Sequence, residues 1–489
     1  MISYFFFNPG KLVVVFGSFL FILLLDCKEP AENNNTVVSY DSCSFTILNT
    51  VDRKVSDLLL GFNVVYPHEK DKIWDDGKIA EDLKEIRASL IRFPGGTVTS
   101  FYHWNAMSGN GWADSFDPEN NLVNQPASEF MDIDEYIALI RKTGANPLIG
   151  INLSSGWRWN RIEEGLDEAL GLMRYCRDNN FDVTYWYLDN EPYQPDSNGG
   201  SKTAEEYAGL INIFAPAMKE FNPRIRIIAN WNAGFANKRA EYEKLITIAG
   251  KNIDIIDVHW YWAWKQADQM GKWLAETPMT LWTKNPYTSE ITDFHTMVAD
   301  FGYPDIKLAS FEWNVGPGNG VDINLTKHQC ALIQSEMMMQ FITGGLDMAV
   351  FWPLHWPDIN FKYRGLIDTD DNITQPNFGI FRFLSGFQGN NLLKTVSSHT
   401  ISQTMYIATM NSGNDTLRMC FLNKNPFKVR VSVSYNQAGM MNLQDINVYT
   451  LKDSGNGSDF QALKPLLQKN SDLQFLSPEV SLTMITLVK

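Results

Sequence analysis

Short apolar runs alternate with longer amphipathic stretches from Leu58 to about Leu384. Apolar residues recur at helical spacing in the amphipathic stretches, whereas the short runs have the length and composition of buried strands. Eight such strands separated by helices predict a (β/α)8 TIM barrel, an α/β fold, over residues 58–384. The predicted strands are Leu58–Val65, Leu90–Phe93, Pro147–Leu153, Val183–Leu188, Ile225–Ala229, Ile253–Trp260, Ile306–Phe311 and Met348–Pro353, and the clearest helices are Met131–Thr143, Leu166–Asn179, Ala204–Glu220 and Lys327–Thr343.

An open, doubly wound parallel sheet is the alternative fold for this alternation of strands and helices. Such a sheet normally carries a glycine-rich phosphate-binding turn after an early strand, and this sequence has none. The barrel is therefore the preferred prediction.

After Leu384 the pattern changes to short β-rich segments separated by Gly, Asn, Ser and Asp turns. This pattern predicts an accompanying C-terminal β-sandwich domain over residues 385–489, to which residues 36–57 add N-terminal strands. No long low-complexity linker separates the two domains, so we expect them to pack together. The predicted strands are Thr400–Met410, Leu417–Leu422, Lys428–Tyr435, Asn447–Leu451 and Val480–Val488.

The first 27 residues have the features of an export signal. Leu12–Leu25 is almost entirely apolar, which is too short for a comfortable membrane span and suits the h-region of a signal peptide. The ending at Cys27 resembles a bacterial lipoprotein signal, although Asp26 stands where a small residue is usual. We expect lipidation at Cys27 and a membrane link only through that anchor, at the bacterial outer membrane or cell surface. Plain secretion, a periplasmic protein and an uncleaved anchor are the alternatives.

Charge and composition narrow the classes of partner. The chain has 41 Lys+Arg against 56 Asp+Glu, a net charge of −15, which argues against a nucleic-acid partner. Aromatic residues make up 13% and include 15 Trp, and their flat apolar rings suit stacking on ligands. The four remaining cysteines, Cys43, Cys176, Cys330 and Cys420, have no CxxC spacing, so we expect isolated buried thiols.

Two carboxylates close predicted strands of the barrel. Glu191 follows the fourth strand and Glu312 follows the seventh, and each is flanked by aromatic residues. Barrel active sites lie at the carboxyl ends of the strands, so the two side chains are expected to face each other across the mouth. Two facing carboxylates are what retaining glycoside hydrolysis requires, one as nucleophile and one as acid/base.

Several longer motifs resemble a known family. They are Arg92–Thr97 (RFPGGT), Tyr185–Glu191 (YWYLDNE), Asp257–Tyr261 (DVHWY) and Phe311–Val315 (FEWNV). Asn-Glu after strand 4 and a second Glu after strand 7 look like the clan-A retaining glycoside hydrolases. The set of motifs is similar to family 51 of the glycoside hydrolases, the α-L-arabinofuranosidases, over most of residues 58–384.

The resemblance implies roles for individual residues. Glu191 is the acid/base and Glu312 the nucleophile. Asn190 hydrogen-bonds the sugar 2-hydroxyl, and Arg92 keeps the nucleophile ionised. A proton donor needs a raised pKa, so we expect the pKa of Glu191 to be raised.

His259 and Tyr261 bracket the site by the same resemblance, with Tyr261 reaching toward Glu312. Asn63 and Thr97 lie at two positions that bind the arabinofuranosyl ring in the family. There the family has Glu and Asn respectively, so the departures leave the sugar open. No metal or organic cofactor is implied, because two carboxylates and water suffice.

Tryptophans after the strands suggest how much substrate is bound. Trp157, Trp159 and Trp356 lie beside polar residues and are expected to form a platform for several sugar units of a polysaccharide or oligosaccharide. The sequence thus predicts a glycoside hydrolase, most like an α-L-arabinofuranosidase, with an endo-acting agar-, glucan- or xylan-like glycanase as the alternative. The alternative from another class is a catalytically inactive surface glycan-binding protein.

Overall fold

The computed structural model describes residues 40–74, 77–105, 112, 114, 130–195, 200–232, 235–317, 325–355, 365–367, 373, 376–440, 443–452, 461–469 and 472–489. The predicted signal with Cys27, and the predicted platform residue Trp356, lie outside these residues. Asp41–Lys489 forms one compact unit. In the described part of the chain, no helix is both long and apolar enough to cross a membrane.

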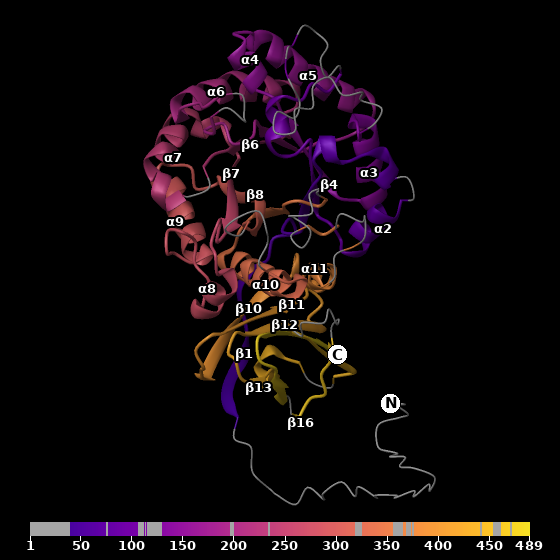
Figure 1. Cartoon of the computed structure of the whole chain (residues 1–489), viewed down its shortest axis with the longest axis vertical. Helices are drawn as coiled ribbons and strands as arrows, with labels where there is room; N and C mark the ends of the chain where they lie inside the picture. Colours follow the sequence, from indigo (N-terminus) through magenta and orange to yellow (C-terminus); the bar gives the residue numbers. More distant parts are fainter. Residues whose placement is uncertain are drawn as a thin grey trace, which may run out of the picture. The chain divides into compact units, whose positions relative to one another are not determined.

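The predicted barrel is confirmed. Its eight described strands run parallel in sequence order, and the first strand pairs with the last, so the sheet closes and is not an open doubly wound sheet (Figure 1). The strands are β2 (Gly61–Asn63), β3 (Leu90–Phe93), β4 (Asn146–Ile151), β5 (Tyr185–Leu188), β6 (Arg226–Asn230), β7 (Ile255–Trp262), β8 (Lys307–Val315) and β9 (Met348–Phe351).

Helices surround the barrel, and local sequence sets where several of them begin and end (Figure 1). The helix at 133–143 begins with a capping box between Asp132 and Glu135 and ends at Gly144, whose φ of 75° favours glycine. The helices are α1 (Asp71–Trp74), α2 (Lys78–Glu85), α3 (Ile133–Thr143), α4 (Ser154–Arg158), α5 (Ile162–Asp178), α6 (Ala204–Phe221), α7 (Phe235–Ala249), α8 (Gln269–Ala275), α9 (Tyr287–Asp300), α10 (Lys327–Gly344) and α11 (Asn377–Leu384).

An apolar layer fills the barrel interior beneath a polar layer at the mouth. Leu90 and Ile228 belong to the buried interior cluster, together with Tyr187 and Phe311. Side chains alternate along a strand, so residues two positions further on face the same interior. Arg92 follows Leu90 in this way and Asn230 follows Ile228, and both are fully buried. The alternation therefore puts charged and amide groups at the carboxyl ends of the strands.

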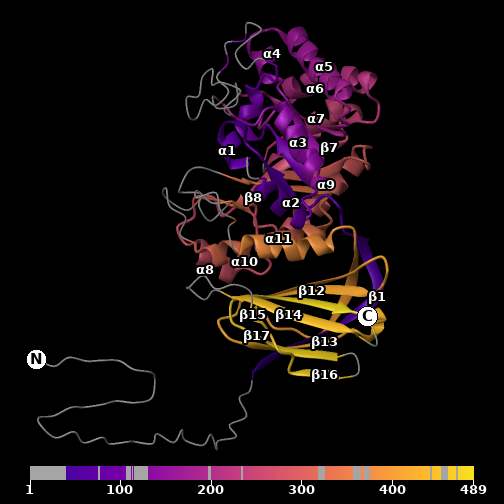
Figure 2. The same cartoon turned by 90° about the vertical axis from the view of Figure 1, so that its right-hand side faces the viewer.

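A second domain is built from one curled sheet of ten strands over its own apolar core (Figure 2). The N-terminal strand β1 lies inside this sheet, antiparallel to β10 and parallel to β13, as the sequence predicted. The strands are β1 (Asp41–Lys54), β10 (Asn391–His399), β11 (Thr404–Met410), β12 (Thr416–Asn423), β13 (Val429–Ser434), β14 (Asp445–Lys452), β15 (Gln461–Ala462), β16 (Leu467–Lys469), β17 (Asp472–Ser477) and β18 (Ser481–Val488).

The barrel and the sheet domain share one contact region under α10. Apolar residues of the sheet, such as Leu422 and Met484, belong to the same buried cluster as the helices of the barrel. A fully buried ion pair crosses this region, with Lys424 Nζ 2.9 Å from Glu336 Oε2. The four cysteines, Cys43, Cys176, Cys330 and Cys420, are free and buried, as expected.

Candidate active site

Glu191 lies in a tight turn that follows β5. Asp189 and Glu191 have φ angles of 64° and 42°, in the left-handed region that non-glycine residues seldom adopt. The backbone N–H of Glu191 donates to Asn230 Oδ1 at 2.5 Å. This bond ties the backbone of the turn to the neighbouring strand β6.

A buried ion pair supports the same turn. Asp189 is fully buried and lies 3.3 Å from Lys202 Nζ. It also accepts hydrogen bonds from Ser100 at 2.7 Å and Ser154 at 2.6 Å. With these partners the Asp189 charge is compensated, so the turn is held on several sides.

Glu312 lies within β8, where the strand pairing is irregular. The register between β8 and β9 shifts between Ser310 and Trp313, and the register between β7 and β8 shifts at Val258 and His259. A bulge of this kind changes the direction of the following side chain. Phe311 remains in the interior apolar layer, and Glu312 is only 6% exposed.

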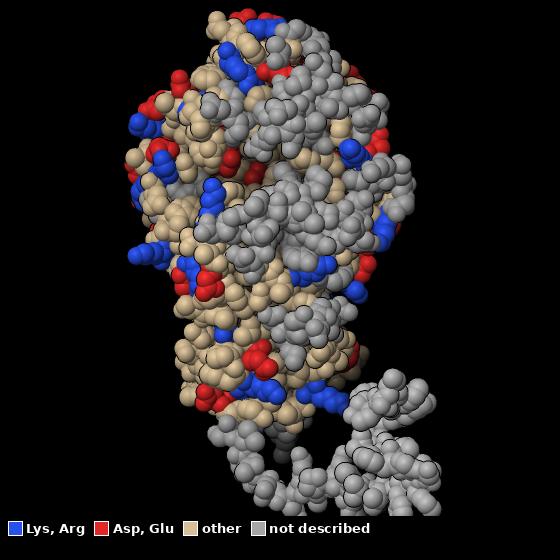
Figure 3. Space-filling model, in the orientation of Figure 1, with Lys and Arg blue, Asp and Glu red and all other residues tan. Residues whose placement is uncertain are grey.

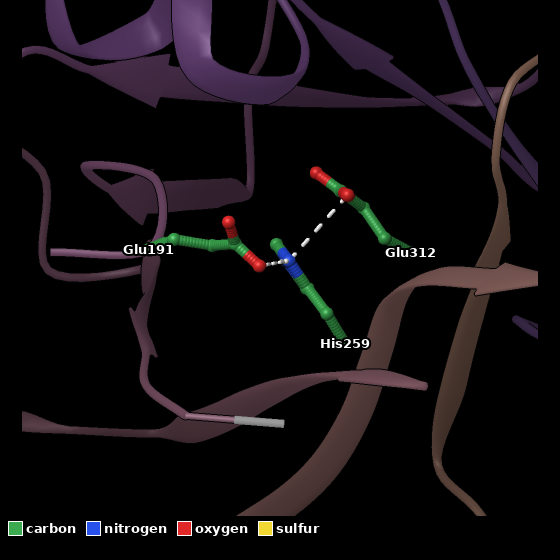
Figure 4. A group of neighbouring side chains, drawn as sticks. All are labelled: Glu191, His259 and Glu312. Carbon is green, nitrogen blue, oxygen red and sulfur yellow. Dashed lines mark hydrogen bonds and ion pairs between the residues drawn. The ribbon is translucent and has the colours of Figure 1, made fainter. Parts of the chain in front are cut away.

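The two carboxylates meet at the mouth of the barrel. One oxygen of Glu191 and one of Glu312 lie within 4.8 Å of each other, with His259 between the two side chains (Figure 4). Acidic side chains are visible inside a hollow on this face of the molecule (Figure 3). A separation of roughly 5–5.5 Å is typical of retaining glycosidases, whereas inverting enzymes need about 6.5–9.5 Å.

One positively charged and one neutral hydrogen-bond donor hold the Glu312 carboxylate. Arg92 Nη1 donates to Oε1 at 3.0 Å, and the Tyr261 hydroxyl donates to Oε2 at 2.7 Å, so Tyr261 reaches Glu312 as the family resemblance implied. Arg92 is fully buried and its guanidinium lies 4.4 Å from the centre of the Tyr187 ring. The carboxylate is thus fixed by one charged and one neutral hydrogen bond.

His259 links both glutamates to a third carboxylate. Its Nδ1 lies 2.9 Å from Glu191 Oε1 and 3.5 Å from Glu312 Oε2, and its Nε2 lies 3.3 Å from Asp257 Oδ2. Burial alone would lower the pKa of His259, but the charges of Glu312 and Asp257 outweigh it and raise this pKa to about 10. These carboxylates therefore favour the protonated imidazole in the free site.

The electrostatics of Glu191 differ from the expectation of a raised pKa. Burial would raise the pKa of Glu191, but the hydrogen bond from protonated His259 and the bond from the Tyr193 hydroxyl, 2.9 Å away, leave it lowered. The sequence motif did not reveal that the histidine would be charged. The expectation was wrong for the free site because the proton lies on the neighbouring imidazole.

Asn63 and Asn190 both contact Arg92. Asn190 Oδ1 accepts from Arg92 Nη2 at 2.6 Å, which fixes the orientation of the Asn190 amide at the mouth. Asn63 is fully buried, and its Oδ1 accepts from Arg92 Nη1 at 3.0 Å. Its Nδ2 donates to the carbonyl oxygens of Phe311 and Phe351 at 2.7 and 3.0 Å. Asn63 thus links its own strand, β2, to β3, β8 and β9.

The other expected substrate-binding residues lie in the segments that follow β3 and β4. Thr97 is partly exposed in a short 3-10 helix that follows β3. Trp157 is half-buried in α4, with Lys202 Nζ 4.7 Å from its ring centre. Trp159 is 45% exposed and donates through Nε1 to Asp114 Oδ1 at 3.0 Å. Of these, Trp159 presents the most open ring.

Three residues in the site were not singled out from the sequence. Asn230 and Tyr193 bond Glu191 directly, and Asp257 lies behind His259 while accepting the backbone N–H of Phe311 at 2.6 Å. Asn230 closes a predicted strand as Glu191 and Glu312 do, so its position was a usable signal. Tyr193 lies beyond the motif at 185–191, and no comparable signal pointed to it.

The same cluster includes potential metal ligands. Ligand atoms of Glu191, His259 and Glu312 all lie within 4.8 Å of one another. A metal would require the neutral imidazole, whereas Nδ1 faces two carboxylates and the raised pKa favours the protonated ring. The Arg92 guanidinium beside Glu312 adds a further positive charge. This environment suits a proton better than a divalent cation.

Comparison with known proteins agrees with the motifs. The family model described as "Alpha-L-arabinofuranosidase 1 domain" matches residues 82–277. The α-L-arabinofuranosidase C of Emericella nidulans is 31% identical over 168 residues, which are 31% of this chain and 31% of that protein. The chain therefore spans about a third of the length of the curated relatives it matches.

Solved structures match nearly the whole chain in fold. The thermostable GH51 α-L-arabinofuranosidase from Thermotoga petrophila has a TM-score of 0.69 at 18% identity, covering 91% of this chain and 100% of that one. A bifunctional glucanase-xylanase from a metagenome library, CelM2, has a TM-score of 0.65 at 13% identity, covering 92% and 100%. The resemblance is confirmed: residues 82–277 match an α-L-arabinofuranosidase domain in sequence, and nine-tenths of the chain match a GH51 structure in fold.

Proposed function

We propose that this protein is a retaining glycoside hydrolase, most like an α-L-arabinofuranosidase. The observation that carries the proposal is the pair of carboxylate oxygens, from Glu191 and Glu312, within 4.8 Å at the mouth of the barrel. The named relatives are α-L-arabinofuranosidases, and the matching family model spans the positions of Arg92, Glu191 and His259.

In the first step Glu312 attacks the anomeric carbon and forms a covalent glycosyl-enzyme ester, while the glycosidic oxygen takes a proton from Glu191 and departs. In the second step Glu191 removes a proton from water, and the resulting hydroxide attacks the anomeric carbon and releases Glu312. Arg92 and Tyr261 hold Glu312 in line for both steps.

His259 supplies the proton that Glu191 needs. The free site carries this proton on the imidazole, 2.9 Å from Glu191 Oε1. When the substrate covers Glu191 and excludes water, charge separation becomes more costly, and the proton moves from Nδ1 to Oε1. The Tyr193 hydroxyl keeps the receiving oxygen in place, and Asn230 holds the backbone N–H of Glu191.

The identity of the sugar that is cleaved is a separate, more specific part of the proposal. The relatives favour an arabinofuranoside. Asn63, at a position that binds the arabinofuranosyl ring in the family, is fully buried here, and its side chain bonds Arg92 and two backbone carbonyls. A glycanase that cleaves within a chain is the second candidate, since the open ring of Trp159 suits a longer substrate. An inactive glycan-binding protein would not need the ordered contacts of Glu312.

A substrate screen tests the proposal. The protein is incubated with 4-nitrophenyl α-L-arabinofuranoside, arabinan, arabinoxylan, β-glucans and agar-type polymers, and the products are separated by chromatography. Glu312→Gln and Glu191→Gln serve as inactive blanks, and Glu205→Gln on the exposed side of α6 is the matched control. Arabinose alone supports the exo-acting enzyme, and a ladder of oligomers supports the glycanase. Turnover in both blanks as fast as in the parent would contradict the proposal, and binding by the parent without turnover would support the glycan-binding alternative.

We also propose export and lipid anchoring at Cys27. The support is the apolar Leu12–Leu25 run directly before that cysteine. Expression in a bacterial host with labelled palmitate, comparing the parent with Cys27→Ser, tests this: label in the parent only is expected, and label in neither chain would contradict anchoring.

A further inference from the structure

Trp264 stands next to the catalytic pair with its indole ring open to solvent. It is 48% exposed and follows β7 in the chain. Its ring centre lies 5.3 Å from that of Tyr261 in an edge-on arrangement, and the Tyr261 hydroxyl bonds Glu312 at 2.7 Å. One aromatic ring thus separates Trp264 from the carboxylate that attacks the sugar.

The turn that carries Trp264 is held in an uncommon backbone conformation. Its neighbours Ala263 and Lys265 both have left-handed φ angles, 52° and 56°. Such residues cost on the order of 1 kcal/mol each and persist where surrounding structure fixes them. The indole is therefore presented by a defined turn.

The loop after β8 holds the turn that carries Trp264 in this conformation. Gly316 N–H donates to the carbonyl of Trp262 at 2.7 Å, and Lys265 N–H donates to the carbonyl of Pro317 at 2.7 Å. The buried Gln269 side chain donates to the carbonyls of Ala263 and Gly316, at 3.1 and 2.8 Å. The backbone of Trp264 is thus tied to the end of the strand that carries Glu312.

Close approach of the two loops depends on a glycine. A Cβ on Gly316 would lie 2.7 Å from the Cα of Trp264, which is closer than side chains tolerate. Glycine at 316 therefore allows the Trp264 turn to sit directly against the β8 loop.

The surroundings of Trp264 indicate what it binds. Lys265, Gln266 and Asp268 in the same turn are exposed and polar, so the indole is a single apolar face among hydrogen-bonding groups. An apolar protein partner would need a broader patch. A sugar ring has an apolar C–H face and hydroxyl edges, which match an indole bordered by polar side chains.

We infer that Trp264 is the stacking surface of a sugar-binding subsite beside the catalytic pair. This subsite takes the sugar ring adjacent to the one that Glu312 attacks. This inference rests on the proposed function for its substrate class. It assigns to Trp264 a role in recognising at least two linked sugar rings, with Tyr261 between the subsite and the nucleophile.

Substrates of different length test the subsite. The parent, Trp264→Ala and Trp264→Phe are compared on a one-ring substrate, the glycosyl fluoride of the sugar found by the screen, and on the linear oligosaccharides of that sugar with two to five rings. We expect Trp264→Ala to leave kcat/KM for the fluoride within about twofold and to lower it about tenfold for the oligosaccharides, mainly through KM. Trp264→Phe should recover part of the loss. Tyr449→Ala, which removes a 43% exposed aromatic ring from β14, is the matched control and should match the parent.

Two results would overturn the subsite. An equal loss on the fluoride and the oligosaccharides would make Trp264 a residue that only positions Tyr261, and no loss on either would leave it without a role in binding.

A binding measurement separates this inference from the proposed function. Titration calorimetry of Glu312→Gln with the same oligosaccharides, with and without Trp264→Ala, reads affinity without turnover. If the parent proves inactive on every substrate, the oligosaccharides of arabinan and xylan are titrated instead. About tenfold weaker binding on removal of Trp264 would then support the subsite while the hydrolase proposal fails, and unchanged binding would contradict the subsite.

Discussion

His259 Nδ1 lies 2.9 Å from Glu191 Oε1, so the residue placed as proton donor is hydrogen-bonded to a histidine that carries the proton. The pKa of His259 is raised to about 10, and that of Glu191 is lowered. The two residues hold one proton between them, and activity should be lost when that shared proton is lost.

We predict that His259→Gln moves the alkaline limb of the kcat/KM profile to lower pH. In the parent the imidazole holds the shared proton with a pKa raised to about 10, whereas in the variant only the Glu191 carboxyl can hold it, and the ordinary pKa of a carboxyl lies well below that of the charged histidine. The profile is measured with an aryl glycoside whose leaving group needs protonation. A 2,4-dinitrophenyl glycoside, which departs unaided, should show no shift. His399→Gln, an exposed histidine on β10, is the control, and an unmoved limb in His259→Gln would contradict proton sharing.

Arg92→Lys should lower kcat about 100-fold with a smaller effect on KM. The guanidinium contacts Glu312 through Nη1 and Asn190 through Nη2, and one ammonium group cannot reproduce both directions. Steady-state kinetics on the active substrate measure the change. Activity within twofold of the parent would show that the two-pronged contact is dispensable.

Asn63→Asp should destabilise the barrel by about 1–3 kcal/mol. The substitution keeps the shape of the side chain but replaces the amide that donates to Phe311 and Phe351 with a carboxylate facing two carbonyl oxygens. Thermal unfolding followed by circular dichroism measures the change in Tm. Asn414→Asp, in a turn between β11 and β12, is the control. A Tm equal to that of the parent would indicate that Asn63 is not needed to hold these strands.

A second buried histidine predicts a pH dependence of stability. His103 lies between Asp114, 3.0 Å from Nε2, and Glu168, 2.9 Å from Nδ1. Burial opposes its charge, but the hydrogen bonds to these carboxylates raise the pKa of His103. The stabilisation is complete below the unfolded pKa of about 6.5 and is lost as the pH rises through the higher folded value.

The Tm difference between the parent and His103→Asn should therefore be largest near pH 6 and become smaller as the pH rises. Both chains retain His259, so the comparison isolates His103. A Tm difference that is constant from pH 6 to pH 10 would contradict the predicted contribution.

The parts of the fold and site that local sequence determines were predictable. The Leu90–Phe93 run is β3 itself, and strand order brings Glu191, just after β5, close to Glu312, in the second half of β8. Residues whose roles depend on several strands were not predictable in the same way. Asn63 contacts carbonyls 248 and 288 residues away in the chain, and a pattern along one strand carries no sign of either contact.

The charge of His259 was equally hidden from the sequence. It follows from Asp257 and Glu312, which lie on two strands whose register shifts beside His259. Irregularities of this kind depend on how neighbouring strands pair, so the motif could locate His259 but not its protonation. The raised pKa expected for Glu191 failed for that reason.

The anomeric configuration of a transfer product tests the central claim most directly. The enzyme is incubated with 4-nitrophenyl α-L-arabinofuranoside, or the glycoside that the screen identifies, in buffer containing methanol, and the methyl glycoside formed is identified by 1H NMR. Double displacement through Glu312 predicts a methyl glycoside with the same anomeric configuration as the substrate, and none from Glu312→Gln. A methyl glycoside of inverted configuration would contradict the roles given to Glu191 and Glu312.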